Sequence, residues 1–212
     1  MNGAKVYDRR TDKTLGRAEI PWETVEAVID FLEPLHCSVD CFQNDRGLMA
    51  RKYYDRLEQY VTHPPSFALV KRTREPVDDL KEAVLAGGGS VQKLQAYFPD
   101  LELRPKVMEQ CKLVFPDLVQ AISMPANLEF NAPDATKGNG LRTLCRCLGI
   151  DPREAAAFGD GTNDLSLLQE AGIGVAMANG APETLAAADL TAPSNEEDGV
   201  AQILSRWFPP NT

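Results

Sequence analysis

The sequence reads Phe158-Gly159-Asp160-Gly161-Thr162-Asn163-Asp164 at the point where an apolar strand pattern gives way to an amphipathic helix pattern. Residues 155–158 form a short apolar run typical of a buried strand, and leucines recur at helical spacing after the turn. The turn therefore places two carboxylates and an amide at the carboxyl end of a strand, where α/β sheets hold their ligands. Acidic oxygens in that position suit a hard cation such as Mg²⁺. The alternative is purely structural, because Gly-Asp-Gly and Asn-Asp are also ordinary turn formers.

A second position with chemical potential is Lys137, at the start of a predicted helix. The apolar face of that helix carries Leu141, Leu144, Cys145 and Leu148. A cation in a first helical turn opposes the helix dipole, at a cost of about 0.3–1 kcal/mol. The same place gathers free backbone N–H groups and an ammonium, which together predict an anion site. A solvated surface lysine is the alternative.

Composition restricts the class of protein. The chain has 212 residues, enough for one domain or two small ones, with 43% hydrophobic and 25% charged residues, as in ordinary globular proteins. A net charge of -9 and a pI near 4.8 argue against a general nucleic-acid or anionic-membrane binder. No apolar run reaches membrane-spanning length, and the first residues show no signal-peptide pattern. Five cysteines without framework spacing indicate reduced thiols in a cytoplasm.

The order of elements predicts an α/β protein. Before residue 131 we expect strands at 5–7, 37–42, 47–50, 91–97, 118–123 and 128–131, and helices at 21–35, 53–61, 77–85 and 104–115. The Pro64-Pro65 pair is expected to end the helix at 53–61. After residue 133 the strands become short and fully apolar, as in a parallel sheet covered on both faces, at 155–158, 174–177 and 190–192. A boundary is therefore expected near 131–134.

Other site motifs are excluded. The Lys-Gly order at 137 and 138 is the reverse of a phosphate-binding Gly-Lys-Ser/Thr loop. The cysteine spacings match no zinc site, and Cys145 lies on the apolar side of its helix, which predicts a packed thiol. The chain has two histidines, His36 and His63, which argues against a Ser-His-Asp catalytic triad.

Taken together, Lys137 and the turn at 158–164 resemble a known signature. The matching segments are Ala135-Thr136-Lys137-Gly138-Asn139-Gly140-Leu141, Phe158-Gly159-Asp160-Gly161-Thr162-Asn163-Asp164-Leu165, residues 171–180 and residues 194–201. They resemble the haloacid dehalogenase (HAD) superfamily, in its Cof-type branch of sugar-phosphate and nucleotide phosphatases. The resemblance implies an α/β fold: a HAD-like Rossmannoid core, incomplete because its first strands are absent, with an inserted α/β cap. It implies domains at 1–9 (core segment before the cap), 10–131 (cap, similar only in its element pattern) and 132–212 (rest of the core).

The resemblance also implies an activity, the Mg²⁺-dependent hydrolysis of a phosphomonoester through an aspartyl-phosphate. In that activity Asp160 would ligate Mg²⁺, and Lys137 would be catalytic and bind substrate by neutralising the transferring group. Asn163 would hydrogen-bond the phosphoryl oxygens, and Asp164 would be catalytic by orienting Lys137 or a metal-bound water. The implied partner is a small phosphorylated metabolite. Cap residues should set the substrate; Asn44-Asp45-Arg46, Arg51 and Lys52 are candidates, or else a solvated hairpin tip.

One expected motif is missing from the sequence. The family's nucleophile is the first Asp of an Asp-x-Asp-x-Thr/Val run, which should precede the segment at Met1, and no such run occurs anywhere in the chain. A late gene start, a truncated clone or a non-catalytic relative would each explain this. A missing N-terminus is preferred, because Lys137 and Asp160 have no obvious use without the nucleophile. The chain by itself is therefore expected to be inactive.

Two further expectations follow from the missing strand. A sheet edge beside residues 155–158 should lack a partner, so the chain should be poorly stable as a monomer or associate with itself. Two other functions also stay open: a regulatory or binding module that keeps Mg²⁺ and phosphate affinity, and a mutase or sugar-phosphate phosphatase of a neighbouring branch.

Overall fold

The computed structural model describes residues 2–209 and divides them into two compact units. The first is formed by residues 17–135, and the second by residues 2–16 together with residues 136–209. The divisions expected from the sequence were at 9 and 131, and the boundaries of the compact units lie at 16 and 135. Strand β1 (Lys5–Asp8) pairs with β2 (Lys13–Arg17), so backbone hydrogen bonds hold residues 10–16 to the second unit.

The first unit contains a six-stranded sheet in the order β5-β4-β3-β6-β8-β7. Its strands are antiparallel to their neighbours except for the parallel pair β4 and β5. The bounds are β3 (Ser38–Gln43), β4 (Arg46–Ala50), β5 (Arg74–Val77), β6 (Lys93–Tyr97), β7 (Val119–Ala121) and β8 (Asn127–Asn131). Asn44 and Asp45 both have positive φ, which suits the tight hairpin between β3 and β4.

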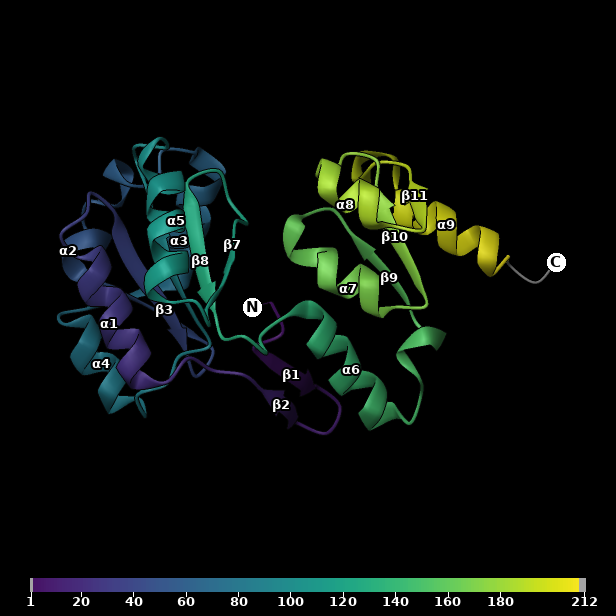
Figure 1. The fold of residues 1–212 in the computed structure, drawn as a ribbon, viewed down its shortest axis with the longest axis horizontal. Coiled ribbons are helices and arrows are strands. Elements are labelled where there is room, and N and C mark those ends of the chain that lie inside the picture. The colour runs from purple at the N-terminus through teal and green to yellow at the C-terminus, as the bar shows by residue number, and fades with distance from the viewer. Residues whose placement is uncertain (1, 210–212) are drawn as a thin grey trace. The chain divides into compact units, whose positions relative to one another are not determined.

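The two faces of this sheet differ sharply. Since side chains alternate along a strand, one face presents the buried apolar residues Val39, Cys41, Leu94, Ala96, Leu128 and Phe130. Helices α1 (Trp22–Leu32) and α4 (Leu80–Ala86), side by side in Figure 1, lie on the Val39 side, and Lys81 of α4 pairs with Asp30 of α1. The opposite face carries buried polar residues, among them Asp40, Gln95 and Glu129.

One predicted helix is wrong. Residues 53–61 are not one helix: α2 (Arg51–Tyr54) and the 3₁₀ turn η1 (Leu57–Gln59) lie there. The proline pair does not end a helix but begins α3 (Pro64–Thr73), because a first-turn proline lacks only an N–H that the helix would leave unpaired. Strands β2 and β5 were not predicted. The other predicted helices and strands are confirmed, including α5 (Leu103–Val114).

The second unit contains a parallel sheet in the order β11-β10-β9. Its strands are β9 (Ala156–Gly159), β10 (Ile173–Met177) and β11 (Leu190–Ala192), and its helices are α6 (Lys137–Leu148), α7 (Leu165–Glu170), α8 (Pro182–Ala187) and α9 (Gly199–Trp207). The 3₁₀ turns η2 (Pro152–Glu154), η3 (Thr162–Asp164) and η4 (Asn195–Glu197) join them, and η2 has a capping box formed by Asp151 and Glu154. Strands alternate with helices, as expected for an α/β unit.

A buried apolar cluster of the second unit lies on the α9 side of this sheet. Val175, Met177, Ala192 and Ile203 form a buried cluster, against which Phe158 and Trp207 pack with ring centroids 6.0 Å apart. Cys145 is buried, as predicted. Of the helices between residues 2 and 209, none combines the length and the apolar character needed to cross a bilayer.

Candidate active site

The site is built where β9 runs into η3. Asp160 directly follows the strand, and η3 folds back so that Asp164 lies beneath the strand end. This turn needs glycine at position 159, since a Cβ there would lie 2.5 Å from the Cβ of Asp164. The local sequence therefore fixes the approach of Asp164 to the strand.

Asp164 is the centre of the arrangement. Its Oδ2 accepts hydrogen bonds from the backbone N–H groups of Asp160 (3.0 Å) and Gly161 (3.1 Å), and its Oδ1 accepts one from the ammonium of Lys137. Burial raises the pKa of Asp164, but the Lys137 ammonium and the two N–H groups outweigh burial and bring the pKa below its usual value. The carboxyl group is therefore a carboxylate near neutral pH, although its side chain is only 5% exposed.

Lys137 is the first residue of α6, as predicted. The Thr136 hydroxyl caps this helix by accepting from the N–H of Asn139 at 3.2 Å, and the N–H of Gly138 donates to the Ser166 hydroxyl at 3.2 Å. The expectation of free N–H groups at this helix start is therefore wrong for these two, because side chains already satisfy them. The Lys137 ammonium is the group of this helix start that can still meet an anion, because the side chain is 32% exposed and reaches solvent while bound to Asp164.

The structure brings the predicted residues of the turn together with Lys137. Asp160 is exposed, and its backbone carbonyl accepts from the N–H of Ala181 at 2.8 Å. Asn163 donates from Nδ2 to the Oδ1 of Asn2 at 3.1 Å. Sequence reasoning missed Ser166 and Asn2 as supporting residues. Ser166 follows the acidic turn closely and could have been noticed, whereas nothing local to Asn2 signals a contact so far along the chain.

The number of available carboxylates decides which metal ion this site could hold. Among residues 2–209, no three His, Cys, Asp or Glu side chains come together in a way that could hold a metal ion. Asp164 is engaged by Lys137 and the backbone, which leaves the exposed carboxylate of Asp160 as the available ligand of the turn. One carboxylate suits Mg²⁺, which commonly takes its other ligands from water and a phosphate, and it does not suit structural zinc.

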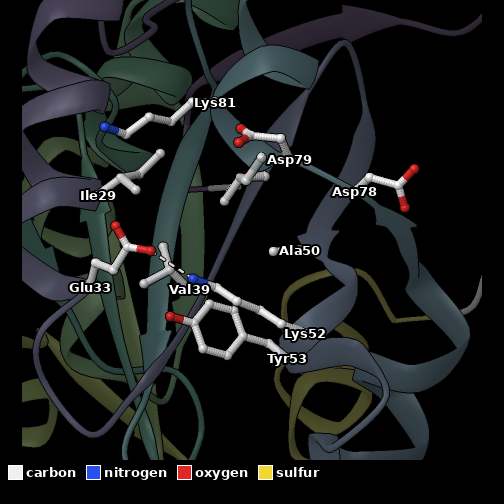
Figure 2. Close-up of a pocket in the computed structure, with 10 residues that line it drawn as sticks. Ile29, Glu33, Val39, Ala50, Lys52, Tyr53, Asp78, Asp79 and Lys81 are labelled. Carbon is white, nitrogen blue, oxygen red and sulfur yellow. Dashed lines mark hydrogen bonds and ion pairs between the residues drawn. The ribbon is translucent and has the colours of Figure 1, made fainter.

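The cap residues with predicted roles in substrate choice form ion pairs. Arg46 pairs with Glu75, Arg51 with Asp78 at 2.8 Å, and Lys52 with Glu33 at 2.6 Å. Figure 2 shows Glu33 and Lys52 pointing toward one another in a pocket of about 300 Å³, with the Tyr53 ring beside the lysine. Ala50 and Val39 also line this pocket, on the helix-covered face of the sheet.

An α/β unit with an ammonium and carboxylates at a strand end, joined to a second sheet-and-helix unit, defines a Rossmann-like fold with a cap. The chain belongs to the haloacid dehalogenase-like hydrolases, whose family profile matches residues 1–204. The resemblance seen in the sequence is thereby confirmed at the level of family and fold.

Three similar proteins illustrate the relationship. The putative phosphatase YxeH of Bacillus subtilis is 29% identical over 209 residues, which is 96% of this chain and 72% of that protein. A protein of Arabidopsis thaliana named endoribonuclease YBEY, chloroplastic, is 48% identical over 80 residues, 38% of this chain but 14% of its own length. The HAD subclass IIB sugar phosphatase BT4131 has a similar structure, with a TM-score of 0.79 and 25% identity over 98% of this chain and 74% of that one.

Proposed function

We propose that this chain carries the charge-stabilising part of a Mg²⁺-dependent phosphomonoester hydrolase. The observation that supports this most is the Lys137 ammonium, held on the Asp164 carboxylate beside Asp160 at the end of β9. Positive charge fixed in advance where a phosphoryl group gathers negative charge is usually the largest contribution to such catalysis.

Each residue of the site has a role in this proposal. Lys137 neutralises charge on the phosphoryl oxygens. Asp164 holds the Lys137 ammonium in place, since two backbone N–H groups fix the Asp164 carboxylate on its other side. Asn163 donates a hydrogen bond to the phosphoryl group, exchanging its contact with Asn2. Asp160 holds Mg²⁺, which when bound supplies further charge neutralisation at the phosphate.

The relatives support a small phosphorylated substrate of the sugar-phosphate or nucleotide class. The name of BT4131 describes a sugar phosphatase. A protein of Escherichia coli named 5-amino-6-(5-phospho-D-ribitylamino)uracil phosphatase YbjI is 34% identical over 50% of this chain and 39% of its own length. Both names describe phosphate esters of polyhydroxylated carbon chains, which makes a sugar phosphate the preferred substrate.

The cellular setting is part of the same proposal. All five cysteines are free thiols, and four of them are buried, which supports a reducing compartment such as the cytoplasm. The net charge of -9 supports a small metabolite over a nucleic acid or an anionic membrane as partner.

Turnover by the proposed mechanism requires a nucleophilic aspartate in an Asp-x-Asp run. No Asp-x-Asp run occurs in residues 1–212, so these residues by themselves are expected to bind phosphate without hydrolysing its esters. The same observation favours a second candidate function, a binding or regulatory module that keeps affinity for Mg²⁺ and phosphate.

Calorimetry with inorganic phosphate and Mg²⁺ tests the site directly. We expect residues 1–212 to bind phosphate in the presence of Mg²⁺, Lys137→Met to weaken phosphate binding about 10-fold or more, and Asp160→Asn to weaken Mg²⁺ binding similarly, since each removes a full charge. In parallel, p-nitrophenyl phosphate with Mg²⁺ should show no turnover above background.

Lys13→Met and Asp198→Asn are the matched controls, because both positions are exposed in the same unit and lie on elements other than the turn. Phosphate binding that is absent, or that both Lys137→Met and Lys13→Met leave unchanged, contradicts the proposed site. Mg²⁺-dependent turnover by the wild-type chain contradicts the expected inactivity and leaves the site assignment standing.

A further inference from the structure

A pocket of the first unit lies where α5 ends and the chain turns toward β7. Its volume is about 420 Å³, within the range of about 300–1,000 Å³ that is typical of small-molecule sites. Its walls come from the end of α5 and the loop after it (114–118), from the segment that enters α1 (19–24) and from the residues that follow β8 (132–133). All of these residues belong to the first unit, so that unit alone describes the pocket.

Two of the walls are held by contacts outside the pocket. The ring of Phe115 meets the ring of Phe31 in α1 in a T-shaped arrangement, with centroids 5.7 Å apart and planes at 90°. Ile20 and Val91 exchange two backbone hydrogen bonds, of 2.8 and 3.0 Å, which fix the segment before α1. Walls that are already held need little ordering when a ligand binds, so less of the binding free energy is lost.

The pocket presents apolar surface to solvent. Val114 is 54% exposed, and Phe115 and Leu118 are half-buried. Three exposed prolines also line the pocket, namely Pro21, Pro116 and Pro133. Removing such surface from water is favourable, so the lining suits a ligand with an apolar body.

The charged groups of the lining select the sign of the ligand. Two carboxylates line the pocket, Glu19 and Asp117, and among the described residues no Lys, Arg or His does. Glu19 is already satisfied, since Arg17 pairs with it at 3.2 Å and the Ser90 hydroxyl donates to its other oxygen. Asp117 is exposed, and its side chain forms no hydrogen bond or ion pair with residues 2–209. One uncompensated negative charge beside apolar surface complements a single positive charge on an apolar body.

We propose that this pocket binds an apolar primary monoamine, with its ammonium at Asp117 and its body against the apolar wall. A carboxylate or a phosphate would meet like charge there, and a polyamine would find no second free carboxylate in the lining. Two stretches of the lining, 19–21 and 132–133, lie within a few residues of the points where the chain passes between the units, so this ligand contacts both connecting segments. The proposal is independent of the proposed hydrolase activity, because it uses no residue of the second unit.

Three ligands that share a phenyl ring on a short chain test this inference: 2-phenylethylamine, 2-phenylethanol and 3-phenylpropionate. Each is titrated into the full chain and followed by amide NMR shifts. We expect the amine to saturate and to move signals at 19–24, 114–118 and 132–135. It should bind about 3-fold or more tightly than the alcohol and the anion, which is the size of effect expected of an exposed ion pair.

Two substitutions separate the charge from the apolar wall. Asp117→Asn should weaken binding of the amine about 3-fold and leave binding of the alcohol unchanged, since it removes the ion pair alone. Val114→Trp, which fills the pocket from an exposed position, should weaken binding of both ligands about 10-fold or more.

Asp55→Asn and Leu113→Trp are the matched controls and should bind the amine like the wild type. Asp55 is an exposed aspartate of the same unit, and Leu113 precedes Val114 on α5 and is 83% exposed, but neither lines the pocket. If Val114→Trp does not fold, Asp117→Asn and the three ligands decide. The inference is overturned if the amine does not saturate, if the alcohol or the anion binds as tightly, if the shifts lie elsewhere, or if either folded variant binds the amine like the wild type.

Discussion

Asp164 shows how one side chain sets the chemistry of the turn. Its carboxylate connects the end of β9 to the start of α6, through two backbone N–H groups and the Lys137 ammonium. Because those donors favour the charged form, the folded state holds this group at a lower pKa than the ordinary value of 3.8. A group with a lowered pKa stabilises the fold above its unfolded pKa, and that stabilisation is lost as the pH falls through the folded pKa.

We therefore expect Asp164→Asn to lower the free energy of unfolding of the second unit near neutral pH by about 1–3 kcal/mol, since an amide cannot satisfy the ammonium and both N–H groups. The difference between wild type and variant should shrink as the pH falls below 3.8, where the wild type also loses its carboxylate. Urea unfolding between about pH 3 and pH 7 measures both effects.

Asp198→Asn is the control for this experiment, because Asp198 is exposed and its side chain caps no helix. Its stability should follow the wild type at every pH. If the difference in unfolding free energy between wild type and Asp164→Asn stays constant through the acid range, Asp164 is not held by these contacts.

At the scale of elements, the contact between α6 and α7 positions Lys137 above the turn. Gly138 is buried at this contact, where a Cβ would lie 2.4 Å from the carbonyl oxygen of Ser166. Gly140, two residues further along α6, has room for a Cβ, with Gly3 Cα the nearest atom at 3.5 Å. The same helix thus holds one glycine that its packing requires and one that its packing does not.

We expect Gly138→Ala to destabilise the second unit by about 1–3 kcal/mol, because α6 and α7 must separate to admit the methyl group. Gly140→Ala should be neutral or stabilise it by up to about 1 kcal/mol, since alanine restricts the unfolded chain and favours the helix. Thermal and urea unfolding of both variants measure the difference. Equal effects of the two substitutions would contradict the close packing at Gly138.

At the scale of the whole molecule, the two units have separate cores, and each has an open sheet. The sheet of the first unit ends at β5 and β7, and the parallel sheet of the second unit ends at β9 and β11. Within residues 2–209, no strand pairs with the other side of β9. An unpaired apolar edge is a template for pairing with another chain.

We expect the chain to associate with itself through β9, so its sedimentation coefficient should rise with concentration. Ala156→Lys should reduce this association, because Ala156 is exposed on β9 and a lysine on an edge strand opposes pairing. Ala201→Lys adds the same charge at an exposed position of α9 and should leave association unchanged. A single monomeric species at all concentrations would contradict this expectation.

The sequence by itself determined the α/β class, the apolar strands β9 to β11, and the two segments that carry Lys137 and Asp160–Asp164. These follow from local periodicity and turn chemistry, which act over a few neighbouring residues. Local pattern was less reliable at the proline pair, where the same residues can end one helix or begin another, and the structure shows that they begin α3.

Only the tertiary structure decided which side chains meet. It joined Lys137 to Asp164, satisfied the N–H of Gly138 with Ser166, and brought Asn2 to Asn163. It also set the strand register that gathers Asp40, Gln95 and Glu129 on one face, although each comes from a different strand. Such contacts depend on how distant segments pack and on which residues of two strands lie opposite each other, and neither is written in the local pattern of either segment.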